Sequence, residues 1–182
     1  MRKTYMFLAL VSVVSAIAFS SCEKIKEKIF DSFSANGADY EFTIPIIANT
    51  NEATLSTTTV NFNVDSAIKA NTKGFFGVGI LKQINPEEVT LNLLNANDLN
   101  NLANFESFKV QVTTPSNSTP TVIASMTNPD TYAATTKLTV DNSKDLLDLL
   151  KASSITYKVI GKARRITTQP LKAQLIVKLK FK

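Results

Sequence analysis

Residues 171–182, at the C-terminus, read Leu-Lys-Ala-Gln-Leu-Ile-Val-Lys-Leu-Lys-Phe-Lys. Apolar side chains occupy every second position from Leu171 to Phe181, and lysines take four of the positions between and after them. Successive side chains of a strand point to opposite faces of a sheet, so this alternation predicts a strand with one buried face. Each large apolar side chain contributes ~1.5–3 kcal/mol on burial. A slip of one residue would bury lysines instead, so the register is strongly determined.

The same period of two recurs along the chain. It is clear at residues 60–64, 89–93, 108–112 and 155–159, and weaker at 40–48, 75–81, 121–126 and 136–141. Turn-forming residues separate several of these segments. The pattern predicts an all-β protein with antiparallel strands. We expect a two-sheet β-sandwich, Ig-like in general architecture, and a closed β-barrel is the alternative.

Two short segments depart from the alternation and predict helices. Asn142–Asp145 provides capping residues for a helix that would contain Leu146, Leu147, Leu149 and Leu150. Asp98–Leu102 is expected to form a single helical turn before Phe105.

The N-terminus has a different composition. Arg2 and Lys3 precede the apolar stretch Tyr5–Phe19, whose 15 residues carry no charge. A membrane-spanning helix needs about 20 such residues, whereas this length is typical of a signal peptide. Ser20 and Ser21 then lead to Cys22, the only cysteine. One interpretation of this segment is an ordinary signal peptide that is cut near Ser20 or Ser21; the other follows from the position of Cys22.

This arrangement resembles the cleavage site of bacterial lipoproteins, and its relaxed form is similar to that of Bacteroidota lipoproteins. The resemblance implies cleavage before Cys22, acylation of Cys22 and attachment to the outer membrane, at its periplasmic face or at the cell surface. We therefore expect a signal peptide at residues 1–21, a tether at 22–38 and the β domain at 39–182.

Residues 99–182 also resemble the C-terminal part of small β-sandwich lipoproteins of Bacteroidota. The features that carry this resemblance are the strand Phe105–Val112, the leucine-rich helix Asp145–Leu150 and the closing alternating strand. The resemblance implies a fold, and it transfers no catalytic residue and no ligand.

The composition excludes several kinds of catalytic and metal-binding site. The chain has no His, no Trp and one Cys, which excludes an intrachain disulfide, a zinc site of His and paired Cys, and His-dependent triads. Ser66–Lys69 matches the S-x-x-K pattern of acyl-transfer enzymes, but their S-D-N and K-T-G motifs are missing. Glu87 and Glu88 are adjacent, so on a regular strand they would face opposite sides. We expect no catalytic residues, no metal and no cofactor.

Two groups of residues are candidate contact surfaces. The chain after Asp148 has nine basic residues and no acid. If the strands near 155–162 and 171–181 pair, their outward lysines share one basic face. This face would either bind an anionic ligand or protect an exposed sheet edge from unwanted pairing. Its members are Lys158, Lys162, Lys172, Lys178 and Lys180. Phe75 and Phe76 lie among three glycines, either as core residues of a bulged strand or as an exposed apolar loop.

The sequence thus favours a membrane-anchored lipoprotein that acts as a non-catalytic binding or structural module at the outer membrane. A glycan, a lipid headgroup or a protein is the expected partner, and the export signal argues against nucleic acid. The alternative is a cell-envelope hydrolase that uses carboxylates or a Ser/Lys pair.

Overall fold

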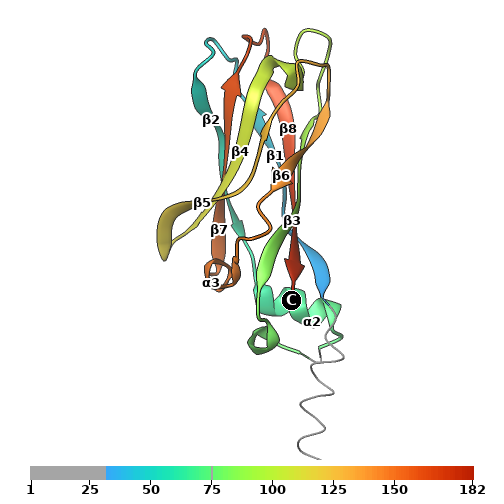
Figure 1. The fold of residues 1–182 in the computed structure, drawn as a ribbon, viewed down its shortest axis with the longest axis vertical. Helices are drawn as coiled ribbons and strands as arrows, with labels where there is room; N and C mark the ends of the chain where they lie inside the picture. Colours follow the sequence, from blue (N-terminus) through green and yellow to red (C-terminus); the bar gives the residue numbers. More distant parts are fainter. Residues whose placement is uncertain (1–31, 75) are drawn as a thin grey trace, which may run out of the picture. The chain divides into compact units, whose positions relative to one another are not determined.

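The computed structural model describes residues 32–74 and 76–182. It confirms the all-β prediction, with antiparallel strands and short helices (Figure 1). The strands are β1 (Phe33–Ile44), β2 (Glu52–Asn61), β3 (Ile84–Leu93), β4 (Phe105–Thr114), β5 (Asn117–Thr127), β6 (Thr135–Val140), β7 (Ser154–Ala163) and β8 (Leu171–Phe181). The helices are α2 (Val64–Asn71) and α3 (Leu147–Leu150), with 3₁₀ turns η1 (Val78–Ile80) and η2 (Leu102–Asn104).

The strands form one sheet in the order β1-β8-β3-β6-β5-β4-β7-β2. Strand β6 joins the two halves, because Thr135–Leu138 pairs with β3 whereas Thr139 and Val140 pair with β5. No ladder joins β1 to β2 in the described part of the chain. The architecture therefore combines the two predicted forms: two halves face each other as in a sandwich, and the sheet is nearly closed like a barrel.

The core lies between these halves and follows the predicted alternation. All six apolar side chains from Leu171 to Phe181 on β8 are buried, and the lysines between them lie at the surface. Strand β7 alternates in the same way, with Ile155, Tyr157 and Val159 buried. The period of two therefore decides which face of β7 and β8 enters the core.

Side chains, rather than a ladder, bridge the seam between β1 and β2. The Tyr157 hydroxyl on β7 donates a hydrogen bond to the Gly37 carbonyl on β1 at 3.2 Å, and burial raises its pKa. Tyr40 packs against Tyr157, with 6.4 Å between ring centroids. Gly37 lies in a β-bulge of β1, where a Cβ would come within 2.6 Å of Leu179 Cδ1. Glycine at this position therefore lets β1 approach the core.

A polar side chain just before each α-helix accepts a hydrogen bond from a backbone amide of its first turn. The Asn63 side chain accepts a hydrogen bond from the Ser66 amide at the start of α2, at 2.9 Å. Before α3, Asp145 accepts bonds from the amides of Leu147 and Ile84, at 2.9 and 3.1 Å. The predicted helix after Asp145 is confirmed, and its cap also ties that helix to β3.

Three local predictions are wrong. The domain begins at Phe33 rather than at Asp39, because Ser34–Ala38 belongs to β1 and pairs with β8. The strand predicted at 60–64 ends at Asn61, and Val64 opens α2. In the segment predicted as a strand at 75–81, the described residues 76–81 form no strand and contain η1 instead. The signal peptide, Cys22 and the remaining part of the predicted tether lie outside the described residues.

Candidate functional site

The five lysines were expected to share one face if their two strands paired, and the topology does not meet that condition. Strands β7 and β8 lie in different halves of the sheet, β7 between β2 and β4, and β8 between β1 and β3. Lys158 and Lys162 therefore lie on one half, whereas Lys172, Lys178 and Lys180 lie on the other. The single basic surface predicted from the sequence does not form.

Acidic side chains also pair with several of these lysines. Lys178 lies 3.0 Å from Glu88, and Lys180 lies 3.7 Å from Glu87. A bulge between Pro86 and Glu88 allows both glutamates to reach lysines on the same face of β8, contrary to the prediction that they face opposite sides. Hydrogen bonds from Lys137 and Lys178 lower the pKa of Glu88. On β7, Lys162 pairs with Glu106 at 2.7 Å.

In the part of the chain that the structure describes, the other predicted residues are not brought together as one site. The Lys69 ammonium contacts the Asp65 carboxylate at 2.6 Å, so its position is set by an ion pair and not by Ser66. A hollow of about 260 Å³ nearby has Asp65 as its one carboxylate. The described residues contain no group of three metal-ligating side chains. Phe76 is half-buried, and Phe75 lies outside the described residues, so the apolar-loop hypothesis stays a prediction.

One end of the sheet instead gathers exposed apolar side chains. The β1–β2, β3–β4, β5–β6 and β7–β8 connections all lie at this end, at the top of Figure 1, and we call it the loop end. Among the described residues, five of the seven exposed large apolar side chains belong to these connections: Ile46, Leu94, Leu99, Tyr132 and Ile166. Their exposed fractions range from 48% to 73%.

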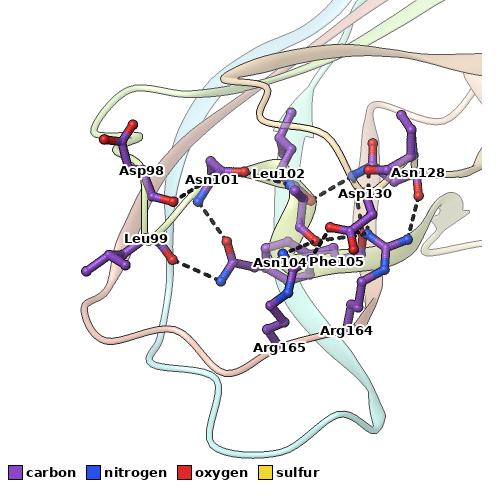
Figure 2. Close-up of polar contacts among 12 residues, drawn as sticks. Asp98, Leu99, Asn101, Leu102, Asn104, Phe105, Asn128, Asp130, Arg164 and Arg165 are labelled. Atoms are coloured by element: carbon purple, nitrogen blue, oxygen red, sulfur yellow. Dashed lines mark hydrogen bonds and ion pairs between the residues drawn. The ribbon is translucent and has the colours of Figure 1, made fainter.

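Buried asparagines hold these loops together (Figure 2). Asn101 and Asn104 cap η2 reciprocally: Asn101 accepts from the Ala103 amide and Asn104 accepts from the Asn101 amide, each at 2.9 Å. The Asn104 amide group also donates to the carbonyls of Leu99 and Ile166, both at 3.1 Å. One side chain therefore fixes two loops that carry exposed apolar residues.

Asn128 and Arg164 extend this network to the β5–β6 connection. Asn128 is buried and its side chain donates to the carbonyls of Leu102 and Phe105, at 2.7 and 3.2 Å. The Arg164 guanidinium donates to the carbonyls of Ala103, Phe105 and Asn128, at 2.8–3.2 Å. Buried carbonyls that lack partners are costly, so these side chains satisfy the backbone where three loops converge.

The β1–β2 connection is hydrogen-bonded to the β7–β8 connection. The Ile47 amide donates to the Thr167 hydroxyl at 2.9 Å, and the Thr167 amide donates to the Ile47 carbonyl at 3.1 Å. These bonds place Ile46 next to the loop of Ile166, which Asn104 already ties to Leu99. The result is a firmly held surface with Ile46, Leu99 and Ile166 exposed.

The loop end carries little charge. Its charged residues are Asp98, Asp130, Arg164 and Arg165, and Asp130 forms ion pairs with both arginines. Depletion of charge around apolar and aromatic side chains is typical of protein interfaces. The arrangement suits contact with an uncharged surface rather than acid–base chemistry.

Sequence reasoning missed this site. It expected a helical turn at Asp98–Leu102, and the structure places η2 at Leu102–Asn104. The available signal was the density of asparagine between Asn92 and Asn104, since this residue favours turns and caps. Which carbonyls these amides would reach depends on loops more than 60 residues away, as in the bond from Asn104 to Ile166.

The sequence matches no protein-family model and no curated protein. Among the described residues, no helix has the length and apolar character that crossing a membrane requires.

Proposed function

We propose that this protein is a lipoprotein attached to the outer membrane through Cys22 and that it works as a non-catalytic binding module. The position of Cys22 directly after an apolar stretch and two serines supports the anchor. Several acyl chains hold a protein on a membrane far more firmly than surface charge does, because each buried CH₂ contributes ~0.8 kcal/mol.

The observation that carries the binding role is the gathering of exposed apolar side chains at the loop end. Strand β1 begins at the end of the sheet opposite the loop end. Exposed apolar patches on soluble domains commonly mark interaction sites.

A protein is the partner that the chemistry of the loop end favours. Anionic lipid headgroups require free cationic side chains, whereas Arg164 and Arg165 are paired with Asp130. Sugars bind well to large aromatic faces, and among the described residues the loop end offers one exposed aromatic ring, Tyr132. Ile46, Leu99 and Ile166 instead supply the aliphatic contacts of a protein interface.

Acylation is tested by labelling cells that express the full chain with an alkyne-bearing palmitate. We expect the wild-type protein to be labelled and to stay with the membrane fraction, and Cys22→Ser to lose both properties. An unlabelled wild-type protein found in the soluble fraction would disprove the anchor.

The binding role is tested by photocrosslinking in the same cells. A photoreactive amino acid at Leu99, 73% exposed, should give a discrete crosslinked protein. The matched control is the exposed Ser118 at the opposite end of the sheet, where we expect no such product. Equal products at both positions, or none at Leu99, would contradict a binding role for the loop end.

A further inference from the structure

Strand β2 leaves one edge of its backbone unpaired. Its register runs against β7 from Glu52 to Asn61, with a bulge between Thr54 and Ser56 and regular pairing from Ser56 onward. Within the described chain, no ladder and no other backbone hydrogen bond reaches Ser56–Asn61 from any strand except β7. A free edge of this kind can accept a further strand.

The composition of β2 does not protect this edge. Residues Thr54–Asn61 contain no charged side chain, no proline and no glycine, and most are β-branched. Proteins usually guard exposed edges with lysine, proline or inward-pointing charges. Strand β1, on the other side of the seam, carries the exposed acids Asp39 and Glu41. The two sides of the seam therefore differ: β2 is open to pairing, and β1 is acidic.

A hollow opens beside the start of β2, and its wall combines apolar side chains with the polar residues Asn49, Asn51 and Thr54. It measures about 230 Å³, and its wall includes Ala53 and Leu55 of β2 and Ile47 of the preceding loop. Gly161 and Phe105 also line it. Small-molecule sites usually measure about 300–1,000 Å³, so this hollow is small for a cofactor and suits an inserted side chain.

The seam also contains a buried polar atom without a hydrogen bond. The Tyr40 hydroxyl is inaccessible to solvent and makes no well-aligned hydrogen bond. Burial raises the pKa of Tyr40, and interactions with the Thr58 and Ser56 side chains on β2 oppose that rise, so this hydroxyl already faces β2. A buried hydroxyl of this kind is costly, and a strand in the seam would bring backbone carbonyls that can accept from it.

We propose that the free edge of β2 binds an extended segment of a partner protein by strand addition. The segment would pair with Ser56–Asn61 and direct apolar side chains at alternate positions toward the hollow and the core. Its outward side chains would be basic or uncharged, because Asp39 and Glu41 line the other side of the seam. Backbone bonds would provide the affinity, and the hollow would select the apolar side chain.

A second copy of this chain fits the seam less well. A copy of β2 would offer mainly threonine side chains, since Leu55 is already buried in its own core. A copy of β1 would bring Asp39 and Glu41 next to the same acids. This binding mode does not depend on acylation of Cys22 or on Leu99. The hollow shares the β1–β2 connection with the loop end, but protection of residues 56–61 and crosslinking at Leu99 are separate measurements, so the two proposals can fail independently.

The test uses the purified full-length protein in detergent and a fluorescent synthetic peptide in which valine alternates with lysine or threonine. We expect saturable binding by fluorescence anisotropy. Hydrogen–deuterium exchange should show new protection of the amides of residues 56–61. A peptide of the same sequence with N-methyl groups on all its amides should lose binding, because it has no N–H donor on either edge.

Matched variants locate the peptide. Ala53→Trp places a large side chain at the hollow and should weaken binding at least about tenfold. Ala70→Trp, at another exposed alanine on α2, should bind like wild type, and circular dichroism checks that both variants fold. Absence of binding, protection away from β2 or equal affinity of both variants would overturn the proposal. Dimerisation through β2 in analytical ultracentrifugation would overturn it in favour of a second copy.

Discussion

Replacement of Asn128 by aspartate tests the idea that buried amides hold the loop end together. The substitution keeps the size and shape of the side chain, so it creates no cavity. It replaces the amide nitrogen that donates to the carbonyls of Leu102 and Phe105, at 2.7 and 3.2 Å, with an oxygen that repels them. The effect on stability therefore reports on these two bonds.

The magnitude follows from the bonds lost. Each net hydrogen bond is worth ~0.5–1.5 kcal/mol, and a buried group without a partner costs a further ~1–3 kcal/mol. The Arg164 guanidinium, 2.8 Å from the Asn128 carbonyl, would offset part of the new charge. We expect Asn128→Asp to lower the free energy of unfolding by roughly 3–5 kcal/mol at pH 7. For a domain of this size, this corresponds to a fall in Tm of roughly 6–20 °C.

The loss should depend on pH. Burial beside two carbonyls raises the pKa of the introduced carboxyl in the folded state, whereas in the unfolded chain it titrates near ~3.9. A protonated carboxyl can donate one of the lost bonds, so the destabilisation is smallest below about pH 4 and grows as the pH rises toward the folded-state pKa. Urea unfolding at pH 4 and pH 7, followed by circular dichroism, measures both values.

Asn142→Asp is the matched control, because Asn142 is exposed in the β6–β7 connection. It should change stability by less than about 0.5 kcal/mol at either pH. A loss for Asn128→Asp that is equally small, or one that does not change with pH, would refute the role assigned to the buried amide.

Three further substitutions test the core, the seam and the surface ion pairs. Gly161→Ala places a Cβ 2.6 Å from Leu55 Cδ1 and should cost ~1–3 kcal/mol in thermal or chemical unfolding. Gly79→Ala, which meets no atom within 4 Å, should be nearly neutral, and equal effects would contradict the packing argument. Tyr157→Phe removes the bond across the seam and should cost ~0.5–1.5 kcal/mol, so unchanged stability would count against that bridge. Glu88→Gln should be less stable than wild type at pH 7, with the difference disappearing as the pH falls through the lowered pKa of Glu88, and a pH-independent difference would exclude its ion pairs as the cause.

Several parts of the fold were predictable from the sequence because they depend on neighbouring residues. The alternation of apolar and polar residues in β7 and β8 predicted correctly which side chains enter the core. The cap at Asp145 predicted α3, since capping is a contact between residues close in sequence. The segment Ser34–Ala38 misled the prediction, because its small residues look like a break, whereas pairing with β8 and contact with Tyr157 make it a strand.

The sequence by itself determined that the chain forms antiparallel strands and which side of its clearest strands, β4, β7 and β8, is buried, because side-chain alternation is a local property with a large hydrophobic free energy. Only the tertiary structure decided the order of the strands. That order separates Lys158 from Lys178, brings Asn104 to Ile166 and leaves β2 with a free edge. Strand order depends on competing pairings between distant segments and on the loops that connect them, and no local pattern encodes those alternatives.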